Sequence, residues 1–581
     1  KKMLSCSCDT MVAMSDVTDD GSIIFAKNSD RQVNEPLDIR FKSAATHLPN
    51  TKLRTTYIEI DQVEKTNSCI LFSPRNIFGA EMGFNCHGLV IGNEALFTKI
   101  PSYSEGLTGM DLVRLVLERC STSREGKDTI FFLLNKYGQG GNCGFTSKFY
   151  YHSSFLLVDS NEGWIIETIG KEYAAKRITK GIHTISNIIS FGGIETFDEY
   201  SKNLIEQAIK NKWCHSYEDF HFQKCYSGFS FNPIELYNGF IKTYFGSGQI
   251  RQNQSKYLIE YLSNKQNSKL KVIDMFNVLR DHKSSKKSFL NDIINVDICM
   301  HAGFGPIKFN QTTGSLVSII PTSKNLIPIH YATCTSLPCL SIYKPLWLDS
   351  SESIPPLFLL SSSLNNSCLT YSSNNIWWKS EIANRNILKY YNKLIKQIEY
   401  ERNKLEFDIV HQSKLLSSKD ISEKQRNNFT IYSFQQVIYS IKKFINNYLF
   451  IYLFIYFYYF KADKLINEWF SRAYKLSFES ESELSFLEEL TWRQWRISAN
   501  IHNYLINYSK VEFNIIKYIF IFILFIFFIF FIFFIFNQFY LIYMIILFTI
   551  YLLFRKIYLK KPKNKKKRDF QLRTLNFNEK N

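Results

Sequence analysis

The chain has twelve cysteines in 581 residues, but they lack the close pairs that are typical of zinc ligands and the regular spacing of a disulfide framework. The closest two, Cys6 and Cys8, form C-x-C rather than C-x-x-C. Three glutamates in or near expected strands, Glu59, Glu94 and Glu167, lack metal-ligand spacing as well. The sequence therefore predicts no metal and no other cofactor.

A secretory signal is also lacking, because the stretch before Cys8 is short and has no apolar core. Cysteines without disulfide spacing are typical of proteins that stay in a reducing compartment. We therefore expect a reduced, cytoplasmic setting.

The net charge of +18 could indicate nucleic-acid binding, but no recognised nucleic-acid motif accompanies it. The densest basic cluster, Arg555–Arg568, directly follows an apolar run. The loop Gly138–Gly141 is glycine-rich but lacks the Lys-Ser/Thr ending of a phosphate-binding loop. We predict no nucleic-acid partner.

Residues 8–348 predict one α+β domain whose strands outnumber its helices. Two helices are expected, Thr108–Arg119 and Thr129–Lys136, the second ending at Gly138. Because few strands alternate with helices, an antiparallel sandwich between helical layers fits better than a doubly wound sheet. The expected strands are Cys8–Met14, Ser22–Ala26, Thr56–Ile60, Ser68–Phe72, Leu89–Ile91, Ser154–Val158, Gly163–Thr168 and His183–Ile189.

The composition of the sequence changes after Leu348. Residues 349–378 are Ser-rich, contain Pro355-Pro356 and predict a linker. Residues 379–510 predict a helical tail, a candidate surface for protein partners, with an apolar insertion at 448–460. Residues 511–581 hold a hydrophobic segment and a basic tail.

Two interpretations of the last segment stay open. Tyr518–Phe536 contains only Tyr, Ile, Phe and Leu and is long enough to span a bilayer, so 518–554 could be a membrane anchor with a cytosolic C-terminus. The same stretch lacks the small residues that help helices pack in membranes. It and 448–460 could therefore be translated non-coding sequence.

Ten segments, in order, cover nearly the whole first domain and resemble the secernin family, which is grouped with N-terminal-nucleophile (Ntn) hydrolases. The resemblance implies the Ntn αββα sandwich, with residues 1–7 as a short leader. The matching segments are CDTMVAM (Cys8–Met14), FAKNSDR (Phe25–Arg31), TYIEIDQV (Thr56–Val63), GAEMGFNCHGLVIGNEA (Gly79–Ala95), GMDLVRLVLER (Gly109–Arg119), KYGQGGNC (Lys136–Cys143), SFLLVDSNEGWIIET (Ser154–Thr168), TISNIIS (Thr184–Ser190), TTGSLVSIIP (Thr312–Pro321) and IYKPLW (Ile342–Trp347).

The resemblance also implies catalytic residues. Cys8 matches the nucleophile, freed by cleavage of the Ser7–Cys8 bond. Asp30 matches the aspartate that holds the new terminal amine. Lys27 stands where related acylases carry arginine, and its charge is expected to lower the pKa of the thiol.

Two asparagines complete the implied site. Asn93 matches a residue that contributes to the oxyanion hole, and Asn187 matches one that contacts the oxyanion or the amine. Without the resemblance, Cys8 would be interpreted as a buried apolar residue, and Asp30 and both asparagines as turn or cap residues.

The leading functional hypothesis is a cysteine dipeptidase or amidase that cleaves small amides through a thioester. The alternative is a catalytically weak or inactive protein that acts as a binding module in regulated secretion.

Overall fold

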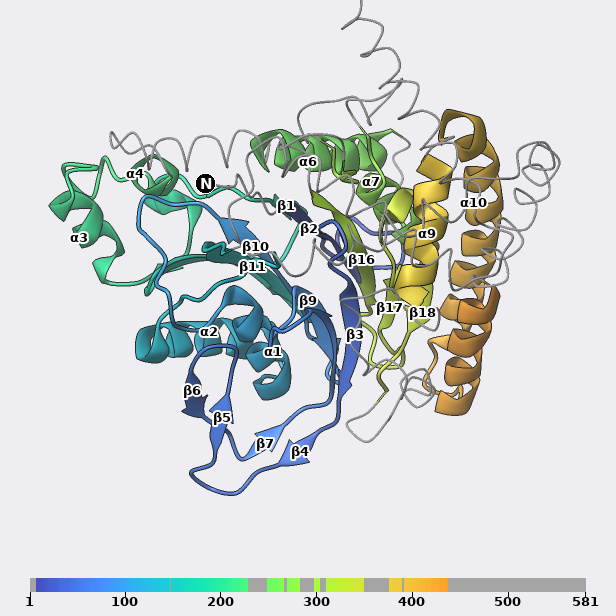
Figure 1. Ribbon diagram of the computed structural model, residues 1–581, viewed down its shortest axis with the longest axis horizontal. Helices are drawn as coiled ribbons and strands as arrows, with labels where there is room; N and C mark the ends of the chain where they lie inside the picture. Colours follow the sequence, from blue (N-terminus) through green and yellow to red (C-terminus); the bar gives the residue numbers. More distant parts are fainter. Residues whose placement is uncertain are drawn as a thin grey trace, which may run out of the picture. The chain divides into compact units, whose positions relative to one another are not determined.

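Two antiparallel β-sheets form the centre of the fold (Figure 1). The computed structural model describes residues 7–146, 148–227, 248–265, 269–282, 297–302, 310–349, 376–388 and 391–436. The strand order in the first sheet is β14 (Ile182–Ile185), β1 (Ser7–Ala13), β2 (Ile23–Gln32), β16 (Asn310–Ile320), β17 (Ile329–Ala332) and β18 (Lys344–Leu346).

The second sheet is built largely from the middle of the domain. Its strand order is β15 (Glu199–Tyr200), β13 (Glu172–Ile178), β12 (Gly163–Ile169), β11 (His152–Val158), β10 (Val90–Leu96), β9 (Met82–Asn85), β8 (Cys69–Pro74) and β3 (Leu37–Lys42). Two small hairpins extend from it, β4 (Ala45–Thr46) with β7 (Lys65–Thr66), and β5 (Lys52–Arg54) with β6 (Glu59–Asp61).

Apolar side chains from the facing sides of the two sheets form the main core. Val12 and Phe25 from the first sheet share one buried cluster with Phe84, Val90 and Leu156 from the second. Burying each such side chain contributes roughly 1.5–3 kcal/mol. Because side chains alternate along a strand, every other residue of β1 and β2 faces this interface between the sheets.

Helices α1 (Gly109–Arg119) and α2 (Ser123–Tyr137) cover the outer side of the second sheet (Figure 1). Thr108 and Thr122 begin them with capping boxes, which satisfy amide groups that the first turn leaves unpaired. Gly138 ends α2 with a φ of 74°, a conformation that glycine adopts without strain. The two predicted helices are present, and α2 begins six positions before the expected Thr129.

Helices α6 (Gly248–Asn264) and α7 (Val272–Leu279) cover the outer side of the first sheet and complete the four layers. The predicted αββα sandwich is thereby confirmed. Further short helices lie at α3 (Asn203–Lys210), α4 (Phe222–Tyr226), η1 (Ile194–Thr196) and η2 (Pro338–Leu340).

The first part of the predicted helical tail packs on the sandwich. It comprises α9 (Ile376–Leu388), α10 (Tyr391–Leu416) and helical residues 423–436. Ile409 and Val410 of α10 share a core cluster with Val317 and Tyr331 of the first sheet. This part of the tail therefore contributes to the core of the domain.

Some strand boundaries differ from the sequence prediction. The β2 strand continues past Ala26 to Gln32, because its polar residues are buried and paired. The expected strand His183–Ile189 ends at Ile185, and the chain then leaves the sheet and reaches Asn187 of the candidate functional site. Helix α9 begins at Ile376, inside the predicted linker.

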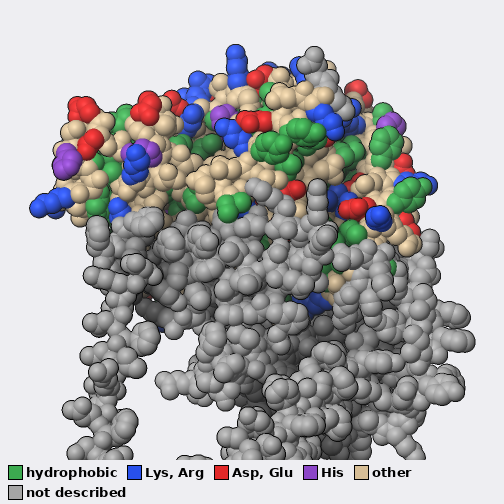
Figure 2. Space-filling model, turned by 90° about the horizontal axis from the view of Figure 1, so that it is seen from above, with side chains coloured by type: hydrophobic (Ala, Val, Ile, Leu, Met, Phe, Trp, Pro, Cys, Tyr) green, Lys and Arg blue, Asp and Glu red, His purple; other side chains and the backbone are tan. Residues whose placement is uncertain are grey.

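The segments 448–460 and 511–581 lie outside the described residues. No helix among the described residues is long and apolar enough to cross a membrane. On the described part of one face, Lys and Arg side chains are interspersed with Asp and Glu side chains (Figure 2).

A buried histidine makes the stability of this core depend on pH. His330 of β17 stacks on Phe84 with ring centroids 3.5 Å apart and contacts Ser318 Oγ at 2.8 Å. Burial lowers its pKa to about 3. The unfolded chain therefore binds a proton at this residue near pH 6.5 while the folded chain does not, so stability is lost as the pH falls below 6.5.

We expect His330→Phe to keep the stacked ring and remove this pH dependence. Between pH 7.5 and pH 5, the free energy of unfolding of the wild type should fall by about 2 kcal/mol more than that of the variant. Urea unfolding at both pH values measures the difference. An equal fall in both proteins would contradict a neutral, buried His330.

Candidate functional site

The hairpin of β1 and β2 presents polar side chains on both faces. Cys8 lies opposite Ser29 and Thr10 lies opposite Lys27, on the side that faces the second sheet. Asp9 lies opposite Asn28, on the side that faces α6 and α7. Because side chains alternate along a strand, one hairpin supplies two groups of buried polar residues, back to back.

The inner group joins the two sheets through a buried ion pair. Lys27 Nζ donates to Glu94 Oε1 at 3.1 Å and to the carbonyl oxygen of Asn93 at 2.7 Å. Thr10 Oγ1 donates to the same Glu94 oxygen. The side chains of Lys27 and Glu94 are both fully buried.

Gly92 leaves the space through which the lysine passes. A Cβ at this position would lie 2.4 Å from Lys27 Cδ, well inside van der Waals contact. The cation therefore reaches Glu94 only because β10 carries a glycine beside it.

Burial has the largest effect on the pKa of the Cys8 thiol. It raises the pKa of Cys8 well above its ordinary value, against the opposing charge of Lys27, and the charges of Glu94, Glu81 and Asp30 raise it further. The lysine thus acts in the predicted direction, but burial outweighs it. In the uncleaved chain the Cys8 side chain is a neutral thiol at pH 7.

The two partners of the ion pair respond differently to the same environment. Burial alone would lower the pKa of Lys27, but the anionic forms of Cys8, Glu94 and Glu81 outweigh burial and raise that pKa. Burial raises the pKa of Glu94 to about 7, against the opposing effects of Lys27 and Thr10. Lys27 is therefore cationic at neutral pH, and Glu94 titrates there.

The backbone nitrogen of Cys8 is held by a carboxamide. It donates to Asn187 Oδ1 at 2.7 Å, and Asn187 Nδ2 donates to the carbonyl oxygen of Ala95 at 3.0 Å. Asn187 follows β14, the strand that pairs with β1 on its other edge. The predicted asparagine therefore lies at the atom that cleavage of the Ser7–Cys8 bond would convert into an amine.

Arg251 of α6 connects this carboxamide to the outer face of the hairpin. Its Nη2 donates to Asn187 Oδ1 at 2.7 Å and to Ser186 Oγ at 3.1 Å, and its Nε donates to Asp9 Oδ2 at 2.9 Å. The side chain is fully buried. The sequence did not indicate this role, because an arginine in the polar stretch RQNQSKY is typical of an exposed helix face.

Asp30 lies on the same outer side of the hairpin, and one of its two carboxylate oxygens accepts a hydrogen bond. Oδ1 accepts a hydrogen bond from Thr312 Oγ1 at 2.6 Å, and Oδ2 is buried without a partner among the described residues. Burial, with the charge of Asp9 next, raises the pKa of Asp30 well above its ordinary value, and Arg251 opposes them. An additional donor near Oδ2 would stabilise the carboxylate.

Asn93 reaches the site through its backbone only. Its side chain alternates away from Glu94 and faces α1, where a Cβ on Gly109 would lie 3.1 Å from Asn93 Nδ2. Both polar atoms of this buried side chain lack partners among the described residues. The structure thus brings Cys8, Lys27, Asp30 and Asn187 together, while the predicted role of the Asn93 side chain stays a prediction.

The arrangement defines a class of protein. Two antiparallel sheets between helical layers, with a cysteine on a strand of the first sheet, form the architecture of the Ntn hydrolases. A profile of peptidase family C69 matches residues 7–403. The chain belongs to this family of hydrolases.

Solved structures with limited similarity were also found. Conjugated bile acid hydrolase from Clostridium perfringens is 12% identical, with 60% of this chain and 99% of that chain covered and a TM-score of 0.32. Penicillin V acylase from Agrobacterium tumefaciens is 12% identical, with coverage of 60% and 89% and a TM-score of 0.29. An acid amidase from Caenorhabditis elegans that hydrolyses N-acylethanolamines is 12% identical, with coverage of 55% and 94% and a TM-score of 0.26.

The inner ion pair predicts opposite effects of two nearly isosteric changes. Lys27→Met removes the charge that lowers the pKa of Cys8, and Glu94→Gln removes a charge that raises it. We expect the pH dependence of Cys8 alkylation by iodoacetamide to shift upward in the first variant and downward in the second, each by about one unit. Mass spectrometry of the Cys8 peptide gives the rates, and shifts in the same direction would refute this electrostatic account.

Arg251 offers a second pair of matched variants. Arg251→Met leaves the Asp9 carboxylate buried without its cation and should cost about 3–5 kcal/mol of stability. Arg251→Lys keeps a charge near Asp9 but cannot donate to Asp9, Ser186 and Asn187 together, so we expect a smaller loss. Thermal unfolding of both variants tests this order, and equal losses would show that the charge contributes little.

Proposed function

We propose that Cys8 is the nucleophile of an Ntn-type cysteine hydrolase that cleaves small amides such as dipeptides, after removal of residues 1–7. The contact between the Cys8 nitrogen and Asn187 Oδ1 carries this proposal. A carboxamide that accepts from a backbone amide at 2.7 Å can also accept from the amine that cleavage would leave there. Membership of a peptidase family supports amide hydrolysis as the reaction class.

The raised pKa of the thiol explains why this cysteine needs a base. A free α-amine has a pKa near 8 and would belong to the same residue. As the sulfur bonds to the substrate carbonyl carbon, the thiol proton passes to the amine. The amine then gives that proton to the leaving nitrogen as the C–N bond breaks, which leaves a thioester.

Water completes the cycle. The amine takes a proton from the water that attacks the thioester, and the tetrahedral intermediate releases the acid while the sulfur regains a proton. Lys27 lies beside the thiol as a permanent cation and stabilises negative charge that develops there. Asn187 orients the amine through Oδ1. Asp30 is the second proposed partner of the amine, because its Oδ2 is buried and accepts no hydrogen bond among the described residues.

Maturation and catalysis can be tested on the full chain. The intact mass of folded, active protein should correspond to an N-terminus at Cys8. Cys8→Ala should reduce dipeptide hydrolysis on the order of 10³-fold or more, since the nucleophile and its amine act as a unit. Cys69→Ala, at an equally buried cysteine of β8, is the control and should keep activity.

An active enzyme that still carries residues before Cys8 would overturn the proposal. An uncleaved protein without hydrolytic activity would favour the alternative, a binding module in regulated secretion. The two outcomes are separated by measuring mass and turnover on the same preparation.

A further inference from the structure

Four potential metal ligands from three separate segments meet on the far side of the first sheet. His282 follows α7, Cys299 and His301 precede β16, and Cys339 lies in η2. One ligand atom from each residue lies within 4.8 Å of every other. Three of the four residues are buried, and His282 is partly exposed.

The distances fit a tetrahedral metal site. His282 Nε2 and His301 Nε2 are 3.0 Å apart, and His301 Nε2 lies 3.6 Å from Cys299 Sγ and 3.3 Å from Cys339 Sγ. Around a tetrahedral Zn²⁺ with bonds of ~2.0–2.1 Å to nitrogen and ~2.3 Å to sulfur, the ligand atoms are separated by about 3.4 Å for N···N and about 3.6 Å for N···S. Each distance agrees with these values to within about 0.4 Å.

We propose that His282, Cys299, His301 and Cys339 bind one structural Zn²⁺. Two thiolates and two imidazoles match the ligand preference of zinc and its tetrahedral geometry. With four protein ligands the site has no open position, which is typical of structural zinc and not of a catalytic metal. Cys299 and Cys339 are both free thiols, as a metal site requires.

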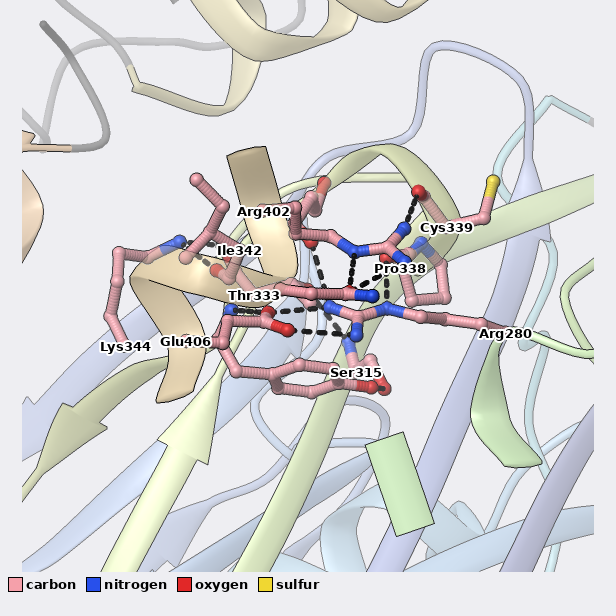
Figure 3. Close-up of polar contacts among 12 residues, drawn as sticks. Arg280, Ser315, Thr333, Pro338, Cys339, Ile342, Lys344, Arg402 and Glu406 are labelled. Carbon is pink, nitrogen blue, oxygen red and sulfur yellow. Dashed lines mark hydrogen bonds and ion pairs between the residues drawn. The ribbon is translucent and has the colours of Figure 1, made fainter. Parts of the chain in front are cut away.

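A buried polar clamp fixes the backbone around Cys339 (Figure 3). Arg280 pairs with Glu406 of α10 through two bonds of 2.8 and 2.5 Å, and it donates to the carbonyl oxygen of Pro338 at 2.8 Å. Arg402 donates to the carbonyl oxygen of Cys339. The sulfur of Cys339 points away from both guanidinium groups in Figure 3, so the clamp holds the main chain and leaves the thiolate to the metal.

Apolar side chains and one ring cover the cluster. Leu337 is buried against the two cysteines, with Leu340 and Leu388 beside it. Tyr391, at the start of α10, lies with its ring centroid 6.3 Å from that of His282 and 6.4 Å from that of His301. A zinc site here would tie α7, the segment before β16, and η2 together beneath the helical tail.

The zinc site would also support Asp30. Met300, between two of the ligands, donates its N–H to Thr312 Oγ1 at 2.9 Å, and the same hydroxyl donates to Asp30 Oδ1 at 2.6 Å. The segment 297–302 thus holds the threonine that orients Asp30. This coupling rests on the proposed function, whereas metal binding does not.

Metal content is the direct test. Full-length protein purified without chelator from zinc-supplemented medium should contain one zinc per chain by inductively coupled plasma mass spectrometry. Cys339→Ser and His301→Ala should lose it, and Cys334→Ser, a buried cysteine outside the cluster, should retain it. Replacement of the metal by Co²⁺ should give the visible absorption of a tetrahedral thiolate site, and this measurement needs no variant to fold.

The stability of the wild type gives a second readout. Removal of zinc by a chelator should lower the midpoint of thermal unfolding, and added Zn²⁺ should restore it. Wild-type protein that binds no Zn²⁺ under these conditions, or that contains a Cys299–Cys339 disulfide in its place, would overturn the proposal. Zinc binding without any hydrolytic activity would leave the metal site established and contradict only the proposed function, and with it the catalytic meaning of the link to Asp30.

Discussion

The alternation of side chains along β1 and β2 is the constraint on which the rest of the structure depends. One hairpin is buried on both faces, so its polar residues must find partners on both faces or make burial unfavourable. On the inner face Glu94 compensates Lys27, and on the outer face Arg251 compensates Asp9. The second sheet and helix α6 are therefore bound to the hairpin by ion pairs as well as by apolar packing, and Cys8 lies between these two sets of contacts.

The burial of Cys8 has a chemical consequence. A cation beside a thiol normally favours the thiolate, yet here the loss of hydration outweighs the charge of Lys27. A lysine suits this environment, because Lys27 acts mainly as a point charge paired with Glu94. Activation of the sulfur would then depend on an amine that belongs to the cysteine itself.

Local patterns predicted strands at β1, β2, β8, β10, β11, β12 and β14, the helices α1 and α2, and the glycine that ends α2, but they predicted no strand at β13, β16, β17 or β18. The resemblance to a known family implied that Cys8, Lys27, Asp30 and Asn187 belong to one site, and the structure places these residues in or beside strands of the first sheet. The face to which Asn93 points could not be predicted, since a shift of one residue in register reverses it. Arg251 and the cluster of His282, Cys299, His301 and Cys339 were missed because their partners are distant in sequence and only the tertiary fold brings them together. The sequence predicted no metal for the same reason.

The hydrogen bonds of the hairpin also impose an order in time. Cys8 is made before Asn187, which holds its nitrogen, before Arg251, which holds Asn187, and before Thr312, which holds Asp30. Glu406, which fixes the main chain beside η2, comes later still. A nascent chain therefore carries Cys8 long before the surroundings of that residue exist, and the candidate site is complete only when synthesis of the domain is nearly finished.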